Sequence, residues 1–265
     1  MTKLYIVEGL PCSGKSTTAK YIADFLEKSG KKVCFFDEGS GQHPADYEYH
    51  AYITQEQLNR LDKIIQEKIK QYSAKNGNGY IVALSEFTET EQQQLLSYKI
   101  YDFLPWETEE PLMLEHWKDF AQRAVQEECV YVFNCVFLQN PMCETMMRFN
   151  FPKDWIYEYI DRINDVISPL EPMIVYLQND DVAERITETA KERAGWLEPV
   201  IDYHVNGGYG RSISAHGIDG YISCLEERQK REQEYLERSD VNSIIIENAH
   251  RDWEKAYEKI TDSLV

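Results

Sequence analysis

A chain of 265 residues is long enough to bury a full hydrophobic core, and a composition of 43% hydrophobic and 28% charged residues is typical of a globular protein. The formal net charge of −18 would repel nucleic acid phosphates and anionic membranes, so we expect neither as a partner. The sequence shows no secretory leader and no apolar run near the roughly 18 residues of a membrane helix, which favours a cytoplasmic location. The six cysteines show no CxxC spacing, which favours buried reduced thiols.

The first forty residues predict a strand, a helix and a second strand. Residues 3–8 are apolar, residues 15–29 carry apolar side chains at helical spacing up to Gly30, and residues 32–37 are apolar again. A strand, helix and strand in this order form a βαβ unit, which implies a parallel sheet.

The rest of the chain continues the alternation. A capping box at Thr54 and Gln57 opens the next predicted helix. Residues 204–220 hold five of the 13 glycines and predict a mobile loop. Further strands are expected over 79–84, 129–138, 173–177 and 243–246, and helices over 55–75, 107–127, 153–168, 180–193, 221–238 and 250–263. The pattern predicts an α/β fold, a doubly wound parallel sheet of about five strands with helical insertions.

A glycine-rich loop follows the first strand and opens the first helix. Glycines at positions 9 and 14 let the backbone turn tightly and point N–H groups inward, where they and the helix N-terminus bind an anion. Lys15 would reach the β and γ phosphates, and the Ser16 hydroxyl would ligate Mg²⁺. The sequence therefore predicts a site for ATP and Mg²⁺, whose nucleotide-binding residues are Gly9, Pro11, Cys12, Ser13, Gly14, Lys15, Ser16 and Thr17.

The loop GLPCSGKST (residues 9–17) resembles that of the P-loop kinases, the family that contains nucleoside and nucleotide kinases. The whole chain also resembles a bacterial group of P-loop proteins, a likeness that does not indicate an acceptor. The resemblance implies a nucleotide-kinase-like P-loop NTPase fold. We expect one domain over 1–265, with a helical insertion over about 86–128 and a lid with the glycine-rich loop over about 180–238.

The segment NDDVAERITETAKER (179–193) resembles the lid of thymidylate-kinase-like enzymes. Those lids carry one arginine early in the helix and another several residues on, and Arg185 and Arg193 fit that pattern. The resemblance implies that both contact the transferred phosphoryl group during catalysis. The alternative is that the two arginines pair with glutamates of the same solvated helix.

Two carboxylates end the second predicted strand. Ligands of open α/β sheets bind beyond the carboxyl ends of the strands, so Asp37 or Glu38 is the candidate base that orients the acceptor hydroxyl. Many P-loop enzymes place an acid at the end of the central strand to hold Mg²⁺, but this chain has Asn134 there. Either Asp37 or Glu38 takes over as the Mg²⁺ ligand, or turnover is slow.

Further polar residues belong near the expected acceptor. Gln139 and Arg148 follow the central strand, and His43 lies in a polar, aromatic loop that we interpret as part of the acceptor pocket. His43 and His50 also admit a zinc site, but their seven-residue spacing is a weak signature. Asn248 follows the last strand, where P-loop kinases often contact adenine.

The sequence leaves two functions open. The first is a kinase that phosphorylates a hydroxyl of a small molecule, and the second is a nucleotide-dependent switch or slow ATPase without such an acceptor. No Asn/Thr-Lys-x-Asp motif is present, which disfavours a GTPase. Residues 33–59 contain no Lys or Arg, so a neutral or cationic acceptor, nucleoside-like or antibiotic-like, is favoured over a nucleotide. The oligomeric state is left open.

Overall fold

The structure is a computed structural model that describes residues 2–193, 195–247 and 252–264. The chain divides into two compact units, Met1–Glu38 with Lys118–Val265, and Gly39–Trp117. This division differs from the expected single domain with a helical insertion over about 86–128. The inserted unit begins at Gly39 and contains strands, and each unit is described by itself below.

The first unit is built on one parallel sheet. Its strand order is β2-β6-β1-β7-β8, so β1 lies at the centre with parallel neighbours on both sides. The strands are β1 (Leu4–Gly9), β2 (Val33–Phe36), β6 (Val130–Asn134), β7 (Met173–Gln178) and β8 (Asn242–Glu247). All of β1 is buried, as expected for a strand covered on both faces. The sheet confirms the predicted doubly wound α/β fold with about five strands.

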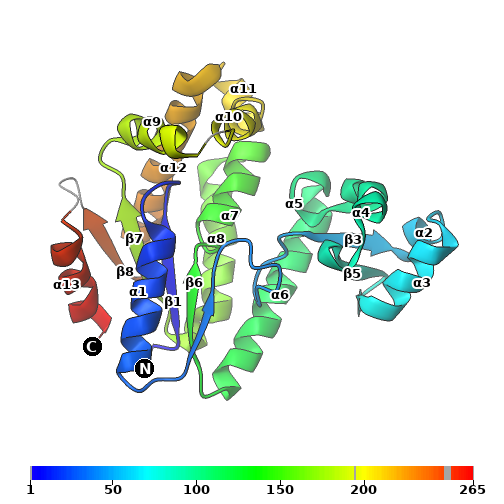
Figure 1. The fold of residues 1–265 in the computed structure, drawn as a ribbon, viewed down its shortest axis with the longest axis horizontal. Helices are drawn as coiled ribbons and strands as arrows, with labels where there is room; N and C mark the ends of the chain where they lie inside the picture. The colour runs from blue at the N-terminus through cyan, green and yellow to red at the C-terminus, as the bar shows by residue number, and fades with distance from the viewer. Residues whose placement is uncertain (1, 194, 248–251, 265) are drawn as a thin grey trace. The chain divides into compact units, whose positions relative to one another are not determined.

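Helices cover both faces of this sheet (Figure 1). On one face, α1 (Lys15–Lys28) and α13 (Trp253–Leu264) pack Ile22 and Ile260 against Val7 and Val175. On the other face, α12 (Gly217–Arg238) reaches β7 through Glu232, which accepts a hydrogen bond from Tyr176 at 2.7 Å. The remaining elements of the unit are α7 (Gln139–Pro141), η3 (Met142–Arg148), α8 (Lys153–Ile167), η4 (Ser168–Leu170), α9 (Val182–Glu192), α10 (Leu197–Val205) and α11 (Gly208–Ser212), and α6 (Trp106–Gln126) crosses the boundary between the units in sequence.

The glycine-rich stretch is mostly helical, so the predicted mobile loop over 204–220 is wrong. Its glycines allow close backbone packing between α10, α11, α12 and η3. A Cβ on Gly208 would lie 2.5 Å from the Arg148 carbonyl oxygen, and a Cβ on Gly210 would lie 2.2 Å from that of His204. Because real Cβ atoms essentially never approach so closely, glycine is required there for packing rather than for mobility.

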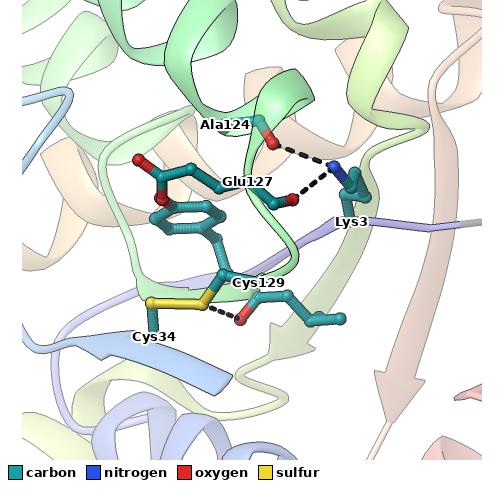
Figure 2. Close-up of a disulfide and its surroundings, with 7 residues drawn as sticks. Lys3, Cys34, Ala124, Glu127 and Cys129 are labelled. Carbon is teal, nitrogen blue, oxygen red and sulfur yellow. Dashed lines mark hydrogen bonds between the residues drawn. A yellow bond between two sulfur atoms is a disulfide. The ribbon is translucent and has the colours of Figure 1, made fainter. Parts of the chain in front are cut away.

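A disulfide joins Cys34 to Cys129, which corrects the expectation of reduced thiols for these two residues (Figure 2). Their Cα atoms lie 6.3 Å apart, within the usual range for a bridge. The two residues are 95 positions apart in sequence, and they meet because β2 and β6 are neighbours in the sheet. Cys12, Cys135, Cys143 and Cys224 form no disulfide.

The second unit contains an antiparallel sheet of order β3-β5-β4. Its core packs Ile53 and Val82 of the sheet against Ile65 and Ile69 of α3. The expected capping box is confirmed, because Thr54 accepts from the Gln57 backbone and Gln57 accepts in return from that of Thr54. The elements are β3 (His50–Thr54), α2 (Gln55–Leu58), α3 (Lys63–Tyr72), β4 (Ala74–Asn76), β5 (Gly79–Ala83), η1 (Leu84–Glu86), α4 (Glu89–Leu95), η2 (Leu96–Tyr98) and α5 (Ile100–Phe103).

We expect Gly210→Ala to lower the free energy of unfolding by about 1–3 kcal/mol, the usual cost of overpacking. The added methyl group would collide with the carbonyl oxygens of His204 and Val205. Ser212→Ala, an exposed position on the same helix, is the control and should change stability by less than about 0.5 kcal/mol. Urea unfolding of the parent and the two variants measures these changes. A Gly210→Ala variant as stable as the parent would contradict close packing at Gly210 and favour the mobile-loop interpretation.

Candidate functional site

The shape of the glycine-rich loop depends on two glycines, at positions where any side chain would be strained and would clash. Gly9 ends β1 with a φ of 143°, and Gly14 precedes α1 with a φ of 94°. A Cβ on Gly9 would lie 2.5 Å from the Leu177 carbonyl oxygen, and one on Gly14 would lie 2.7 Å from the Trp253 ring. The loop therefore packs closely on β7 and α13. The N-terminus of α1 points into the space that the loop encloses, where an anion would bind.

Polar groups of this loop are positioned for an anion. Lys15 is the first residue of α1, and its Nζ donates to the Leu10 carbonyl at 3.0 Å. The hydroxyls of Ser13 and Thr18 are buried and have no hydrogen-bond partner among the described residues. Unsatisfied buried donors are costly, and phosphate oxygens would satisfy them. The residue types and the geometry thus both suit a phosphate chain.

Three side chains converge beside the loop, at the carboxyl ends of β2 and β6. Asn134 ends β6, and its Nδ2 donates to the Ser16 hydroxyl at 3.0 Å and to the Asp37 carboxylate at 2.6 Å. The other amide atom, Oδ1, is buried without a hydrogen-bond partner among the described residues. A hydroxyl, a carboxylate and a free amide oxygen are the oxygen ligands that Mg²⁺ and its bound waters prefer, so this corner fits a magnesium ion.

A second contact lies one residue beyond Asp37. Gln139 begins α7, and its Nε2 donates to the Glu38 carboxylate at 2.6 Å. The structure therefore brings together five predicted site residues at the same edge of the sheet, namely Ser16, Asp37, Glu38, Asn134 and Gln139. Asp37 contacts Asn134 in the corner that fits magnesium, whereas Glu38 contacts Gln139. The sequence did not indicate which of the two carboxylates lies at the metal.

Arg148 lies in η3, where charged and aromatic neighbours surround it. Its guanidinium donates to Glu144 at 2.6 Å and lies 4.4 Å from the centre of the Phe149 ring. The adjacent thiol of Cys143 is partly buried, and its desolvation raises its pKa to about 11, so it is protonated near neutral pH. The positive charge of Arg148 is therefore already paired.

His43 belongs to the second unit and is buried there beside His116. Burial, with a smaller contribution from the His116 charge, lowers the pKa of His43 to about 3, so its ring is neutral at ordinary pH. Within the described ranges, no group of three or more His, Cys, Asp or Glu side chains is placed to hold a metal ion. The substrate role of His43 stays a prediction, and Asn248 lies outside the described residues.

The two candidate lid arginines lie on α9 and at its end. Arg185 is partly buried in the helix, and Arg193 is its exposed C-terminal cap. Both share the helix with Glu184 and Glu188, so pairing with the helix glutamates stays the alternative. Their approach to a phosphoryl group stays a prediction.

The sequence interpretation missed a set of charged residues buried beneath the loop. Arg228 and Glu232 pair at 2.7 Å on α12, and both are almost completely buried. Arg228 also donates to the Gly9 carbonyl at 3.4 Å. Glu8, near the end of the otherwise apolar β1, is fully buried, and its pKa is raised to about 7 mainly by that burial and next by the charge of Glu232. A charge inside an apolar strand was the visible signal for Glu8.

Comparisons with known proteins give one family-model match and a structural similarity. Residues 2–79 match the model of a family described as "Chromatin associated protein KTI12", a stretch that covers less than a third of the chain. A solved structure of deoxyadenosine kinase from M. mycoides with bound dATP is similar at 15% identity and a TM-score of 0.44, over 98% of each chain. That level of similarity says nothing about substrate. No curated protein matches the chain.

The glycine-rich loop and the strand order together define the class of the first unit, a parallel α/β sheet with a P-loop motif after its central strand. No helix among the described residues has the length and apolar character to cross a membrane.

The magnesium corner predicts opposite effects for two substitutions. Asp37→Asn removes the only charged ligand and should weaken Mg²⁺ binding by about 10–100-fold, whereas Asn134→Asp adds a carboxylate and should strengthen it by about tenfold. Calorimetric titration of Mg²⁺ into protein saturated with a non-hydrolysable ATP analogue measures both. Asp24→Asn, an exposed carboxylate on α1, is the control. Unchanged Mg²⁺ affinity in both site variants would place the metal elsewhere.

Proposed function

We propose that the protein transfers the γ-phosphoryl group of ATP to a hydroxyl of a neutral or cationic small molecule. The observation that carries this proposal is the convergence of the phosphate loop, the Ser16–Asn134–Asp37 corner and the Glu38–Gln139 pair at one edge of the sheet. A loop that only bound nucleotide would need the first of these groups but not the third.

The loop residues bind and orient the triphosphate. Backbone N–H groups of the loop and the N-terminus of α1 surround the phosphates, and Lys15 turns from the Leu10 carbonyl toward them. When bound, Mg²⁺ would neutralise the negative charge that develops on the phosphates during transfer. Ser16 and Asp37 would hold the ion, and Asn134 would accept a hydrogen bond from one of its waters.

Glu38 is the proposed base. It lies beside Asp37 but contacts Gln139, so it remains available to the acceptor when Asp37 faces the metal. Its carboxylate would accept the hydroxyl proton as the acceptor oxygen approaches the γ-phosphorus. Arg185 and Arg193 would complete the charge neutralisation and exclude water as the lid closes.

The charges around this edge favour an acceptor without a phosphate group. Arg148 was the one nearby cation that argued for a phosphate, and it is paired with Glu144 at 2.6 Å. Freeing Arg148 for a substrate phosphate would leave the almost fully buried Glu144 carboxylate without its cation, a costly exchange. Nucleosides and aminoglycoside-like amines with hydroxyl groups fit these charges.

A second function is favoured by one observation. Asn134 stands where many P-loop enzymes have an acid, so the metal corner carries one negative charge rather than two. A site with a weakly held metal suits a slow ATPase or a nucleotide-dependent switch. ATP turnover that does not rise with any added alcohol would favour this alternative.

Lys15→Ala should weaken ATP binding by about 10–100-fold and abolish turnover, because a charge-assisted contact to the phosphates is lost. Lys20→Ala is the matched control, because Lys20 lies on the same helix but is exposed and pairs with Asp24 at 2.8 Å. Calorimetry with ATP and Mg²⁺ provides the affinities. If Lys15→Ala and Lys20→Ala bind ATP equally well, the loop does not hold the triphosphate.

A competition experiment tests the class of acceptor. Nucleosides, aminoglycosides and nucleoside monophosphates would be offered together with labelled ATP, and the products identified by mass. We expect phosphorylated nucleosides or amines to predominate, because Arg148 is already paired with Glu144 and binding a second phosphate would disrupt that pair. Preferential phosphorylation of a monophosphate would refute the charge argument and make Arg148 the residue to substitute.

A further inference from the structure

The turn after β6 has an uncommon backbone conformation. Cys135 and Val136 both have positive φ values, 63° and 86°. Positive φ is unfavourable for residues other than glycine and most unfavourable for a β-branched side chain such as valine, so the turn is strained and something must hold it. It connects Asn134, which contacts Ser16 and Asp37, to Gln139, which contacts Glu38. The strain thus lies between the two halves of the candidate site.

The group that holds this turn comes from the central strand. One carboxylate oxygen of Glu8 accepts from the backbone N–H groups of Phe137 at 2.7 Å and Leu138 at 2.8 Å. The other accepts from the backbone N–H of Gln139 at 3.2 Å. Glu8 is fully buried, so water does not compete for these donors. A single side chain therefore satisfies three successive backbone groups that would otherwise be buried without partners.

We propose that Glu8 is a positioning residue, whose carboxylate holds the strained turn so that Asn134 meets the phosphate loop while Gln139 meets Glu38. This proposal rests on the proposed phosphotransfer function. It adds the group that fixes the position of the metal corner relative to the Glu38–Gln139 pair. Glu8 directly precedes Gly9, so the strand that begins the phosphate loop also positions the acceptor side. Movement of this turn by an ångström would misplace both the metal corner and the base.

The three hydrogen bonds that hold the turn depend on the ionisation of Glu8. An ionised carboxylate offers only acceptors to the three N–H donors, whereas the protonated acid presents a donor toward one of them. Burial raises the pKa of Glu8 to about 7, so the hold weakens as pH falls through neutrality. The groups that face Glu8 are Lys15 of α1, Tyr176 of β7, and Glu232 and Arg228 of α12.

Glu8→Gln imitates the protonated acid at every pH, because its amide also presents a donor. We expect the turnover of ATP with Mg²⁺ to fall by about 10–100-fold. The dissociation constant for ATP should change by less than about threefold. The parent should lose activity as pH falls through about 7, and the variant should show no such dependence. Glu109→Gln, a buried carboxylate of the second unit, is the matched control and should keep the parent's pH dependence.

A measurement on the unaltered, nucleotide-free protein protects the test from a variant that fails to fold. In ¹⁵N NMR spectra, the amide signals of Phe137, Leu138 and Gln139 should shift together with a midpoint near pH 7. Signals that stay constant between pH 5.5 and 8.5 would show that Glu8 does not titrate against this turn. Shifting signals with unaltered turnover in Glu8→Gln would refute the positioning role. Failure of the protein to bind ATP would refute the proposed function while leaving the NMR result to stand by itself.

Discussion

Charged side chains buried in a protein interior must be paired, and the first unit places the pair Arg228 and Glu232 beneath its phosphate loop. Arg228 pairs with Glu232 at 2.7 Å and donates to the carbonyl of Gly9, while Tyr176 of β7 donates to the same glutamate. This network fixes α12 against the end of the central strand. Because breaking one partner would leave an uncompensated buried charge, the arrangement tolerates little displacement.

Local signals in the sequence predicted the parts of the fold that depend on neighbouring residues. The β1–loop–α1 unit, the alternation of strands and helices, and the capping box at Thr54 were all readable, because each involves residues a few positions apart. The disulfide between Cys34 and Cys129 was not, since it depends on strand order across 95 residues. The glycine-rich segment was misread because close helix packing and loop mobility both select glycine, and the sequence does not say which.

The candidate site was predictable in membership but not in pairing. Asp37, Glu38, Asn134 and Gln139 were recognisable because they follow strand ends, where parallel sheets bind ligands. Which carboxylate meets which amide depends on the turn after β6, whose positive φ values no sequence pattern indicated. Glu8 was visible as one charge in an apolar strand, yet its role required knowing that the turn of residues 137–139 lies against that strand.

Asn134 stands at the end of β6, where many P-loop enzymes have an acid. This is consistent with phosphotransfer if another residue supplies the negative charge that would hold Mg²⁺. Asn134 donates to Asp37 at 2.6 Å, so the amide orients a carboxylate that arrives from β2 instead of from β6. Its remaining oxygen faces the same corner without a protein partner in the described part of the chain. The corner therefore has one charged ligand and one neutral acceptor, both attached to strand ends. Moving the charge to β2 places it next to Glu38, so the proposed metal ligand and the proposed base are neighbours in sequence. Such closeness requires a rigid partner for each carboxylate, a role for which the amides of Asn134 and Gln139 are suited.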